Sequence, residues 1–276
     1  MSIDTDLVLS GQLLKGKKVV ITGAASEEGI GQATARLFIE HGARPAILDM
    51  DREASEAMAK KVGGDSIGLS CDVSRKQDCE DAIAAVVEEF GDIDVLVNNA
   101  GITHSSRIMD AAQEDFDLLH AVNVRGGFFM SQAVIPHMRK RAQGVIVFLS
   151  SVAGQRGGGL YGSSHYSASK AAVLGLAKAL GRELAEDGIR VNSVAPSLIK
   201  TDVDAMTRFY PSSAFSTQGS KVTDSAEKRG AFEQGVPMRR SGNIWEVAGA
   251  ILFLASDLSS YMTGATIDVN GGFHIH

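Results

Sequence analysis

Short apolar runs alternate along the chain with longer segments in which apolar residues recur every three or four positions. The first run, KVVIT at 18–22, is followed by a segment whose positions 30, 33, 34, 37 and 38 share one helical face. A second such face contains Ile83, Val86, Val87 and Phe90. The later runs are PAILD (45–49), SIGLSCDV (66–73), IDVLVNNAG (93–101), GVIVFLSS (144–151), IRVNSVAP (189–196) and ATIDVNGG (265–272).

Continuously apolar strands separated by amphipathic helices indicate a parallel sheet that is covered on both faces. We therefore predict an α/β fold: a Rossmann-type, doubly wound parallel sheet of about seven strands in three layers (α/β/α). The pattern predicts a single domain over residues 1–276, in which the polar, irregular segment 201–236 is an insertion.

Composition narrows the classes of function. The chain has 276 residues, 44% of them hydrophobic, and a net charge of −6, which argues against binding to nucleic acid or to an anionic membrane. The longest apolar run, 247–255, is too short to span a bilayer, and the N-terminal MSIDTD lacks the basic start of a signal peptide. Cys71 and Cys79 have no metal-ligand spacing, so we expect no metal and two reduced thiols in a soluble, cytoplasmic protein.

The stretch TGAASEEGIG (22–31) links the first predicted strand to the first predicted helix. Gly23 directly follows the strand, and Gly29 and Gly31 open the helix, where free backbone N–H groups and the helix dipole favour a pyrophosphate. In a doubly wound sheet, ligands bind beyond the carboxyl ends of the strands. A dinucleotide site is therefore expected at this turn.

A series of short motifs then occurs in order along nearly the whole chain. They are TG (22–23) with GIG (29–31), CDV (71–73), NNAG (98–101), NV (123–124), SSVAG (150–154), YSASK (166–170) and VNSVAP (191–196). Together they resemble the short-chain dehydrogenase/reductase family, and the resemblance implies an oxidoreductase that interconverts a secondary alcohol and a ketone. Two departures stand out: five residues instead of the family's usual three separate the first two loop glycines, and Ser197 follows Pro196 where the family commonly has glycine.

The candidate catalytic residues fit hydride transfer. Tyr166 and Lys170 lie four apart on a predicted helix, so both side chains point from one face. A nearby ammonium and an oxidised nicotinamide would favour the phenolate, which makes Tyr166 the candidate proton carrier. Ser151 would donate a hydrogen bond to the substrate oxygen. The resemblance implies that Lys170 also holds the nicotinamide ribose and that Asn123 lines a water-mediated proton path. A non-catalytic dinucleotide-binding module, the alternative from another class, has no need of this set.

The resemblance also implies a set of cofactor-binding residues. We expect NAD in preference to NADP, because Asp49 ends the second strand, where a carboxylate accepts hydrogen bonds from ribose hydroxyls and repels a 2′-phosphate. Glu27 and Glu28 add negative charge, and Arg52, the only nearby cation, is expected to face solvent. Asp72 either accepts from the adenine amino group or caps its strand, and Asn99 is either a cofactor ligand or purely structural. The expected cofactor set is Gly23, Ser26, Gly29, Ile30, Gly31, Asp49, Asp72, Val73, Asn99, Ala100, Gly101, Tyr166, Lys170, Pro196, Ile199 and Thr201.

The substrate is less defined. Segment 201–236 occupies the place where the family has a substrate lid. We expect Arg156, with His104 or His165 nearby, to bind a carboxylate or several hydroxyls, and Tyr161 to line the loop above the site. These polar residues favour a sugar or polyol as substrate, with a 3-oxoacyl thioester as the alternative; equally, Arg156 and the histidines could face solvent or a neighbouring subunit.

A homodimer or homotetramer is expected from the resemblance and from the apolar VAGAILFLAS (247–256). The tail FHIH (273–276) either reaches a neighbouring subunit or is a frayed end.

Overall fold

The computed structural model describes residues 11–104, 106–158, 164–201 and 226–276. Its main sheet has seven strands, all parallel, and a small second sheet pairs β7 with β8. The strands are β1 Lys18–Thr22, β2 Arg44–Asp49, β3 Ile67–Ser70, β4 Val95–Asn98, β5 Gly144–Leu149, β6 Ile189–Pro196, β7 Ile199–Lys200, β8 Gly242–Asn243 and β9 Thr266–Val269.

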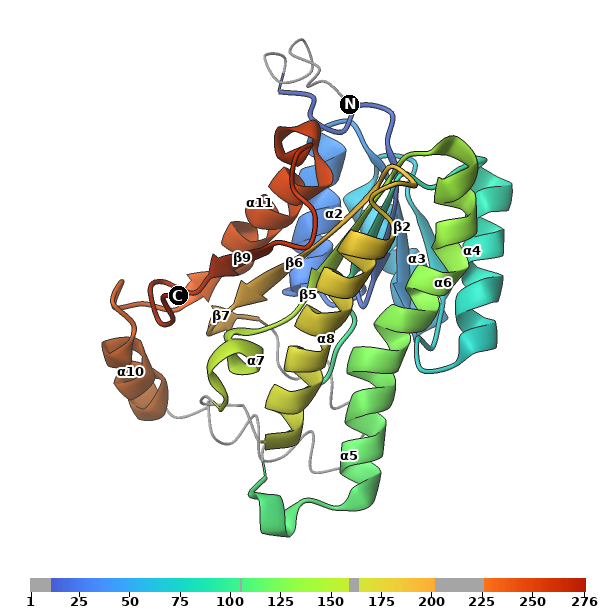
Figure 1. The fold of residues 1–276 in the computed structure, drawn as a ribbon. Helices are drawn as coiled ribbons and strands as arrows, with labels where there is room; N and C mark the ends of the chain where they lie inside the picture. Colours follow the sequence, from blue (N-terminus) through green and yellow to red (C-terminus); the bar gives the residue numbers. More distant parts are fainter. Residues whose placement is uncertain (1–10, 105, 159–163, 202–225) are drawn as a thin grey trace.

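Helices cover both faces of the main sheet, so the molecule has the three predicted layers (Figure 1). The α-helices are α2 Ile30–Glu40, α3 Arg52–Val62, α4 Lys76–Phe90, α5 Gln113–His120, α6 Gly127–Arg141, α7 Val152–Arg156, α8 Ser164–Glu183, α10 Ala226–Gly235 and α11 Ile244–Ala255. The short turns η1 Ile108–Asp110 and η4 Asp257–Ser259 are 3₁₀-helical, whereas η2 Ala121–Gly126 is a π-helix.

Alternation along each strand divides the core into two halves. Val20 of β1 packs with α4, α6 and α8, while Val19 and Ile21 of the same strand pack with α2, α3 and α11. Successive side chains of a strand point to opposite faces, so a strand buried between two helical layers must be apolar at every position. The apolar runs in the sequence have this cause.

The strand order is β3-β2-β1-β4-β5-β6-β9. The order reverses between β1 and β4, which pair in parallel through Val19–Val95, Val20–Leu96 and Ile21–Val97. A crevice at such a reversal, beyond the carboxyl ends of the strands, is the usual ligand site of this fold. The glycine turn after β1 and the NNAG motif at the end of β4 flank it.

Four predicted strands end earlier in the structure, and two of them are β5, which ends at Leu149, and β9, which ends at Val269. β3 ends at Ser70 and β4 at Asn98, so Asp72 and residues 99–101 lie in loops beyond the strand ends. Within the described ranges, no helix combines the length and the apolar character that a bilayer crossing requires.

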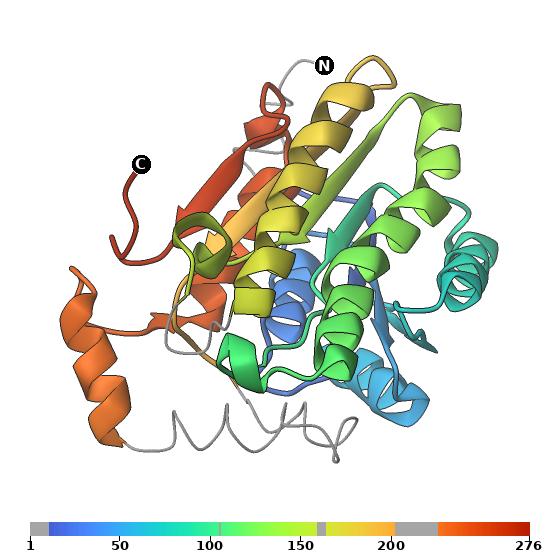
Figure 2. The same ribbon diagram turned by 60° about the horizontal axis from the view of Figure 1, so that its bottom comes forward.

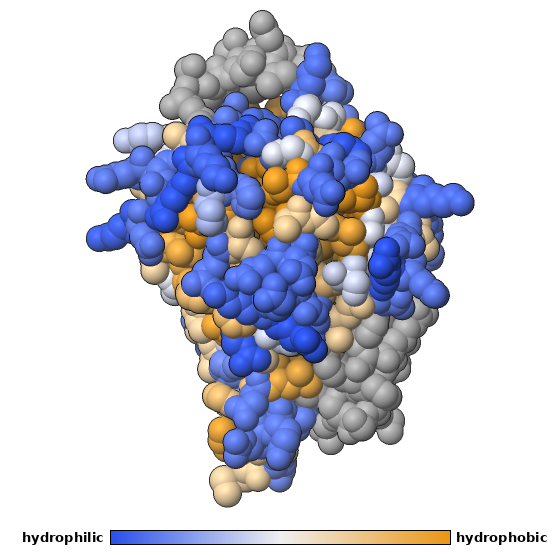
Figure 3. Space-filling view, turned by 90° about the vertical axis from the view of Figure 1, so that its right-hand side faces the viewer, coloured by the Kyte–Doolittle hydropathy of each residue, from blue (hydrophilic) through white to orange (hydrophobic). Residues whose placement is uncertain are grey.

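Apolar residues 247–256 correspond mainly to α11, and most of them are core. Val247, Ala248, Ile251, Leu252, Leu254 and Ala255 are all buried. The run therefore gives little support to the expected oligomer. Large exposed apolar side chains occur instead at Ile108 and Met109 of η1, Phe116 of α5 and Phe128 of α6. Figure 3, which faces the side formed by α4 and α6, shows apolar surface between the charged side chains.

Candidate active site

The glycine turn after β1 packs directly against the loop after β4. Gly23 has φ +64°, and a Cβ there would lie 2.7 Å from the Cα of Ala100. A Cβ on Gly31 would lie 2.8 Å from both the Cα of Ala24 and the Nδ2 of Asn99. Glycine is required at both positions, because backbone is met at contact distance and Gly23 is left-handed.

Polar contacts with Thr22 and Asn99 hold this packing in place. Asn99 Nδ2 donates to the carbonyls of Thr22 at 2.9 Å and Gly23 at 2.8 Å. The hydroxyl of Thr22 accepts from the backbone N–H groups of Asn99 at 3.1 Å and Ala100 at 3.0 Å. The Asn99 side chain therefore has the structural role that the sequence left open.

The turn has features that fit an anionic dinucleotide. α2 begins at Ile30 without a side-chain cap on Gly29 and without an acidic residue in its first turn. Ser26 Oγ is buried, and among the described residues it has no hydrogen-bond partner. Uncapped N–H groups and an unsatisfied hydroxyl at a helix N-terminus suit a phosphate.

Asp49 lies at the end of β2 beside the same turn. Its carboxylate accepts from the N–H of Ala25 at 3.1 Å and from that of Met50 at 2.8 Å. Burial raises the pKa of Asp49, and the two backbone hydrogen bonds oppose that shift. The carboxylate is thus held at a fixed place at the edge of the crevice.

The charges near the turn differ from the expectation in one respect. Arg52 pairs with Glu56 at 2.8 Å on the exposed side of α3, as expected of a solvent-facing cation. However, Lys61 of α3 also reaches the turn, where its Nζ lies 2.7 Å from Glu27 Oε1. The expectation that Arg52 is the only nearby cation was wrong, since Lys61 is distant in sequence and close in space. Lys61 lowers the pKa of the exposed Glu27.

Tyr166 and Lys170 lie on α8, four residues apart as predicted. Lys170 is buried, its Nζ donates to the carbonyl of Leu149 at 3.0 Å, and it lies 6.0 Å from the centre of the Tyr166 ring. Burial lowers the pKa of Lys170 to about 8. A side chain with this pKa can change its charge near neutral pH.

Ser151 forms a hydrogen bond with Tyr166. It is the N-cap of α7, where its Oγ accepts from the N–H of Ala153 at 3.1 Å. Burial raises the pKa of Tyr166, and a hydrogen bond with Ser151 opposes the shift. The sequence led us to expect a lowered pKa for Tyr166. In the protein alone burial outweighs the other influences, so the phenolate would need additional positive charge.

Asn123 lies in the π-helix between α5 and α6. Its Oδ1 accepts from the N–H of Ile102 at 2.8 Å, and its Nδ2 donates to the carbonyl of Ile102 at 2.9 Å and to Ser169 Oγ at 3.1 Å. Single π turns within helices occur frequently at functional sites. Gly101 lies between Asn123 and Lys170, because a Cβ there would be 3.2 Å from both Asn123 Oδ1 and Lys170 Nζ.

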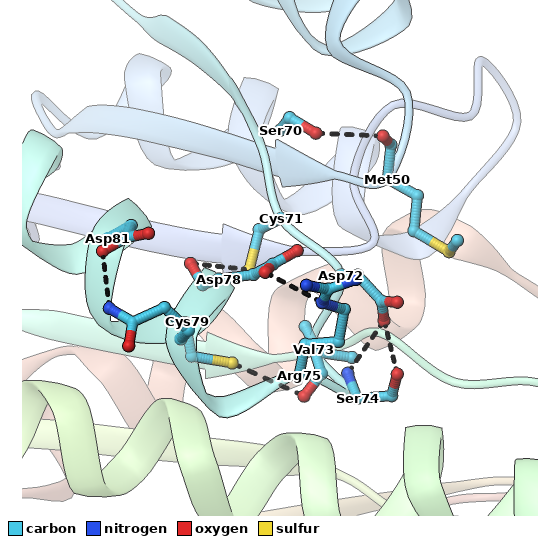
Figure 4. A network of polar contacts seen from close by, with 11 residues as sticks. Met50, Ser70, Cys71, Asp72, Val73, Ser74, Arg75, Asp78, Cys79 and Asp81 are labelled. Carbon is cyan, nitrogen blue, oxygen red and sulfur yellow. Dashed lines mark hydrogen bonds and ion pairs between the residues drawn. The ribbon is translucent and has the colours of Figure 1, made fainter.

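Asp72 is engaged by its own loop. Its Oδ1 accepts from the N–H of Ser74 at 2.9 Å and from the Ser74 hydroxyl at 2.7 Å (Figure 4). This is the capping contact that the sequence offered as the alternative to adenine binding. Beside it, Cys79 Sγ donates to the carbonyl of Val73 at 3.4 Å, and both cysteines are buried free thiols.

The expected substrate residues fall into two groups. His104 and His165 are buried together, with His104 Nδ1 2.8 Å from His165 Nε2 and His104 Nε2 3.5 Å from Asp115 Oδ2. Arg156 instead lies over the ring of Phe273, 4.1 Å from its centre. The structure thus gives the histidines and Arg156 different partners. Tyr161 and residues 202–225 of the expected lid lie outside the described residues.

Three more expected cofactor residues lie at or just beyond the carboxyl end of β6. Pro196 ends β6, Ile199 begins β7, and Thr201 follows β7. Sequence reasoning missed Thr22 and Ser169, although each belongs to a quoted motif: Thr22 is the threonine of TG and Ser169 the second serine of YSASK. Their position inside a motif was the available signal.

Comparison with known proteins agrees with this architecture. A family model described as Enoyl-(Acyl carrier protein) reductase matches residues 23–274. An uncharacterized short-chain type dehydrogenase/reductase from Sinorhizobium fredii is 48% identical over 268 residues, covering 96% of this chain and 100% of the relative. The 3-oxoacyl-[acyl-carrier-protein] reductase of Thermotoga maritima is 40% identical and covers 95% of this chain and 99% of its own. The crystal structure of 3-ketoacyl-(acyl-carrier-protein) reductase from Brucella melitensis, complexed with NADH, superposes with a TM-score of 0.83 at 32% identity, covering 95% of this chain and 100% of its own.

The fold and these relatives define an oxidoreductase that binds a nicotinamide dinucleotide. The chain belongs to the short-chain dehydrogenase/reductase family, whose members act on CH–OH and keto groups. The non-catalytic dinucleotide-binding module is thereby excluded.

Proposed function

We propose that the protein interconverts a secondary alcohol and a ketone with NAD(H), through Ser151, Tyr166 and Lys170. The observation that carries the proposal is the convergence of these three side chains: Ser151 hydrogen-bonds to Tyr166, and the buried Lys170 lies on the same helix. When bound, the nicotinamide donates or accepts the hydride. Asn123 is hydrogen-bonded to the carbonyl of Ile102 and to Ser169, which lies next to Lys170 on α8.

Each residue has a separate task in this proposal. Tyr166 transfers the proton to or from the substrate oxygen, and the Ser151 hydroxyl stabilises the charge that develops there. Lys170, with a pKa of about 8, is largely an ammonium at neutral pH and favours the phenolate of Tyr166. The additional positive charge of an oxidised nicotinamide would offset the rise in pKa that burial imposes on Tyr166.

The proposal is tested by Tyr166→Phe, which removes one hydroxyl and keeps the ring. Turnover should fall by roughly 10²–10⁴-fold, the usual contribution of general acid–base catalysis, while the Kd for NADH stays within about twofold. Ser151→Ala should reduce kcat in the same direction. A Tyr166→Phe enzyme that keeps more than about a tenth of the wild-type kcat would exclude Tyr166 as the proton carrier.

NAD is proposed as the preferred cofactor on the basis of Asp49. Its half-buried carboxylate stands at the end of β2, where a 2′-phosphate would have to be accommodated beside a negative charge. Lys61 is a cation that reaches the turn, and its ammonium is paired with Glu27. The ratio of kcat/KM for NADH and NADPH is the direct measurement.

Two substrate classes remain as proposals. A sugar or polyol is the first, from the polar residues Arg156, His104, Tyr161 and His165. A 3-oxoacyl thioester is the second, supported by relatives named 3-oxoacyl-[acyl-carrier-protein] reductase at 34–40% identity. Oxidation of a polyol panel with NAD, measured against reduction of acetoacetyl thioesters with NADH, separates the two. The thioester is the better supported of the two, because His104, His165 and Arg156 already have partners within the protein.

We further propose a homodimer or homotetramer in the cytoplasm, with segment 201–236 as the substrate lid. The exposed Ile108, Met109, Phe116 and Phe128 support association, and the two free buried thiols suit a reducing compartment. Light scattering at micromolar concentration tests the proposed oligomer, and a monomer in that measurement would contradict it.

A further inference from the structure

We propose that the C-terminal residues 273–276 form a clamp that positions α7, the helix capped by Ser151, and links it to α10. The proposal rests on the role assigned to Ser151 above, and it makes the tail a positioning element for the substrate side of the site. Figures 1 and 2 both place α7 and α10 on the side of the molecule where the chain ends.

α7 needs external support because it has only five residues. A helix of that length is not stable alone. Its inner side is fixed by α8, since a Cβ on Gly154 would lie 2.6 Å from the carbonyl carbon of Lys170. The side chains of its last two residues, Gln155 and Arg156, contact β9 and the C-terminal tail.

The C-terminal tail holds the first of these two residues. Gln155 Nε2 donates to Asp268 Oδ1 of β9 at 2.7 Å and lies 3.2 Å from Nε2 of His276. The same imidazole nitrogen lies 3.1 Å from Asp268 Oδ2. The amide and the imidazole therefore share one carboxylate, with one oxygen each, across 113 residues of sequence.

Phe273 of the tail contacts Arg156, the last residue of α7. The guanidinium of Arg156 lies 4.1 Å from the centre of the Phe273 ring, within the range of a cation–π contact. The ring of Phe232 in α10 lies 4.8 Å from the same ring. Phe273 thus stands between α7 and α10, the helix near the end of the proposed lid segment 201–236.

The tail itself is anchored to the body of the protein. Asn270 is buried at 5% exposure; its Nδ2 donates to the carbonyl of His274 at 2.9 Å, and its carbonyl accepts from the N–H of Phe273 at 3.1 Å. The clamp is therefore built on β9 and transmits its position to α7. A shift of α7 would move the Ser151 hydroxyl relative to Tyr166, and displacements of about 1 Å can cost about 10²-fold in rate.

The test uses Phe273→Ala, with Phe273→Tyr to restore the ring and Ile275→Ala as the matched control. Ile275 lies in the same tail and is 80% exposed, so its loss should have no effect. For whichever probe is turned over, acetoacetyl thioester or polyol, Phe273→Ala should lower kcat/KM by about tenfold or more, leave the Kd for NADH unchanged and speed amide exchange in 152–156. Phe273→Tyr should behave as wild type.

A double-mutant cycle separates the clamp from direct substrate binding by Arg156. If Arg156 acts through Phe273, Arg156→Leu and the double variant should both resemble Phe273→Ala, because neighbours in one network are not additive. Multiplicative effects, or wild-type kcat/KM and amide exchange in Phe273→Ala, would overturn the clamp. Failure of the proposed function gives another result, namely normal turnover in Ser151→Ala.

Discussion

The hydroxyl of Thr22 joins the ends of the two strands that flank the ligand crevice, and its removal is the sharpest test of how the crevice is built. Thr22 Oγ1 accepts from the N–H groups of Asn99 and Ala100 at 3.1 and 3.0 Å and donates to the carbonyl of Val97 at 3.4 Å. The residue is 1% exposed. Thr22→Val keeps the shape of the side chain and removes every one of these contacts.

The expected cost follows mainly from the backbone donor of Ala100, because the N–H of Asn99 keeps a second acceptor, the carbonyl of Val97 at 3.0 Å. An orphaned buried donor costs about 1–3 kcal/mol. Ala100 is only partly buried, so its N–H should recover part of the loss from water. We therefore expect Thr22→Val to lower the free energy of unfolding by about 1–3 kcal/mol. It should also raise the Kd for NADH, because the displaced loop carries Gly101 against Lys170.

Urea unfolding followed by circular dichroism measures the first quantity, and quenching of NADH fluorescence measures the second. Thr22→Ser is the control, since it keeps the oxygen and removes one methyl group, at a cost of about 1 kcal/mol. If Thr22→Val proved as stable as Thr22→Ser, the hydroxyl would not be what joins β1 to the loop after β4.

The sequence predicted all seven strands of the main sheet because each is apolar at consecutive positions, a pattern with a direct physical cause. It placed the ends of four strands too late, and β3 and β4 show the reason. The predicted run SIGLSCDV extends to Val73, yet β3 ends at Ser70. Beyond that end, the carboxylate of Asp72 accepts a hydrogen bond from the N–H of Ser74. IDVLVNNAG likewise runs on after β4 ends at Asn98, where the next two N–H groups turn to Thr22. Apolar patterns define strands well and do not reveal where side-chain hydrogen bonds end them.

The candidate catalytic set could be predicted because Tyr166 and Lys170 are local on one helix and Ser151 follows a strand end. The partners of the proposed substrate residues could not. His104 contacts His165 across 61 residues, and Arg156 contacts Phe273 near the C-terminus. No period or local motif encodes such pairs. Arg156 shows the consequence: its charge suggested a carboxylate ligand, while in the structure an aromatic ring of the C-terminal tail lies against it.

Two further predictions concern charge. Asp49→Ser should reduce the preference for NADH over NADPH, measured as the ratio of kcat/KM values, because it removes the negative charge beside the expected 2′-position; an unchanged ratio would free Asp49 of that role. The second concerns acid stability. Burial lowers the pKa of both His104 and His165 from 6.5, and the proximity of His104 lowers that of His165 further. The unfolded chain therefore binds more protons than the folded one below about pH 6.5, so the free energy of unfolding should fall as pH decreases from there and stay flat above it. Replacing both histidines with Asn should flatten this slope in urea titrations between about pH 5 and 6.5. An equally steep slope in the double variant would show that the acid sensitivity arises elsewhere.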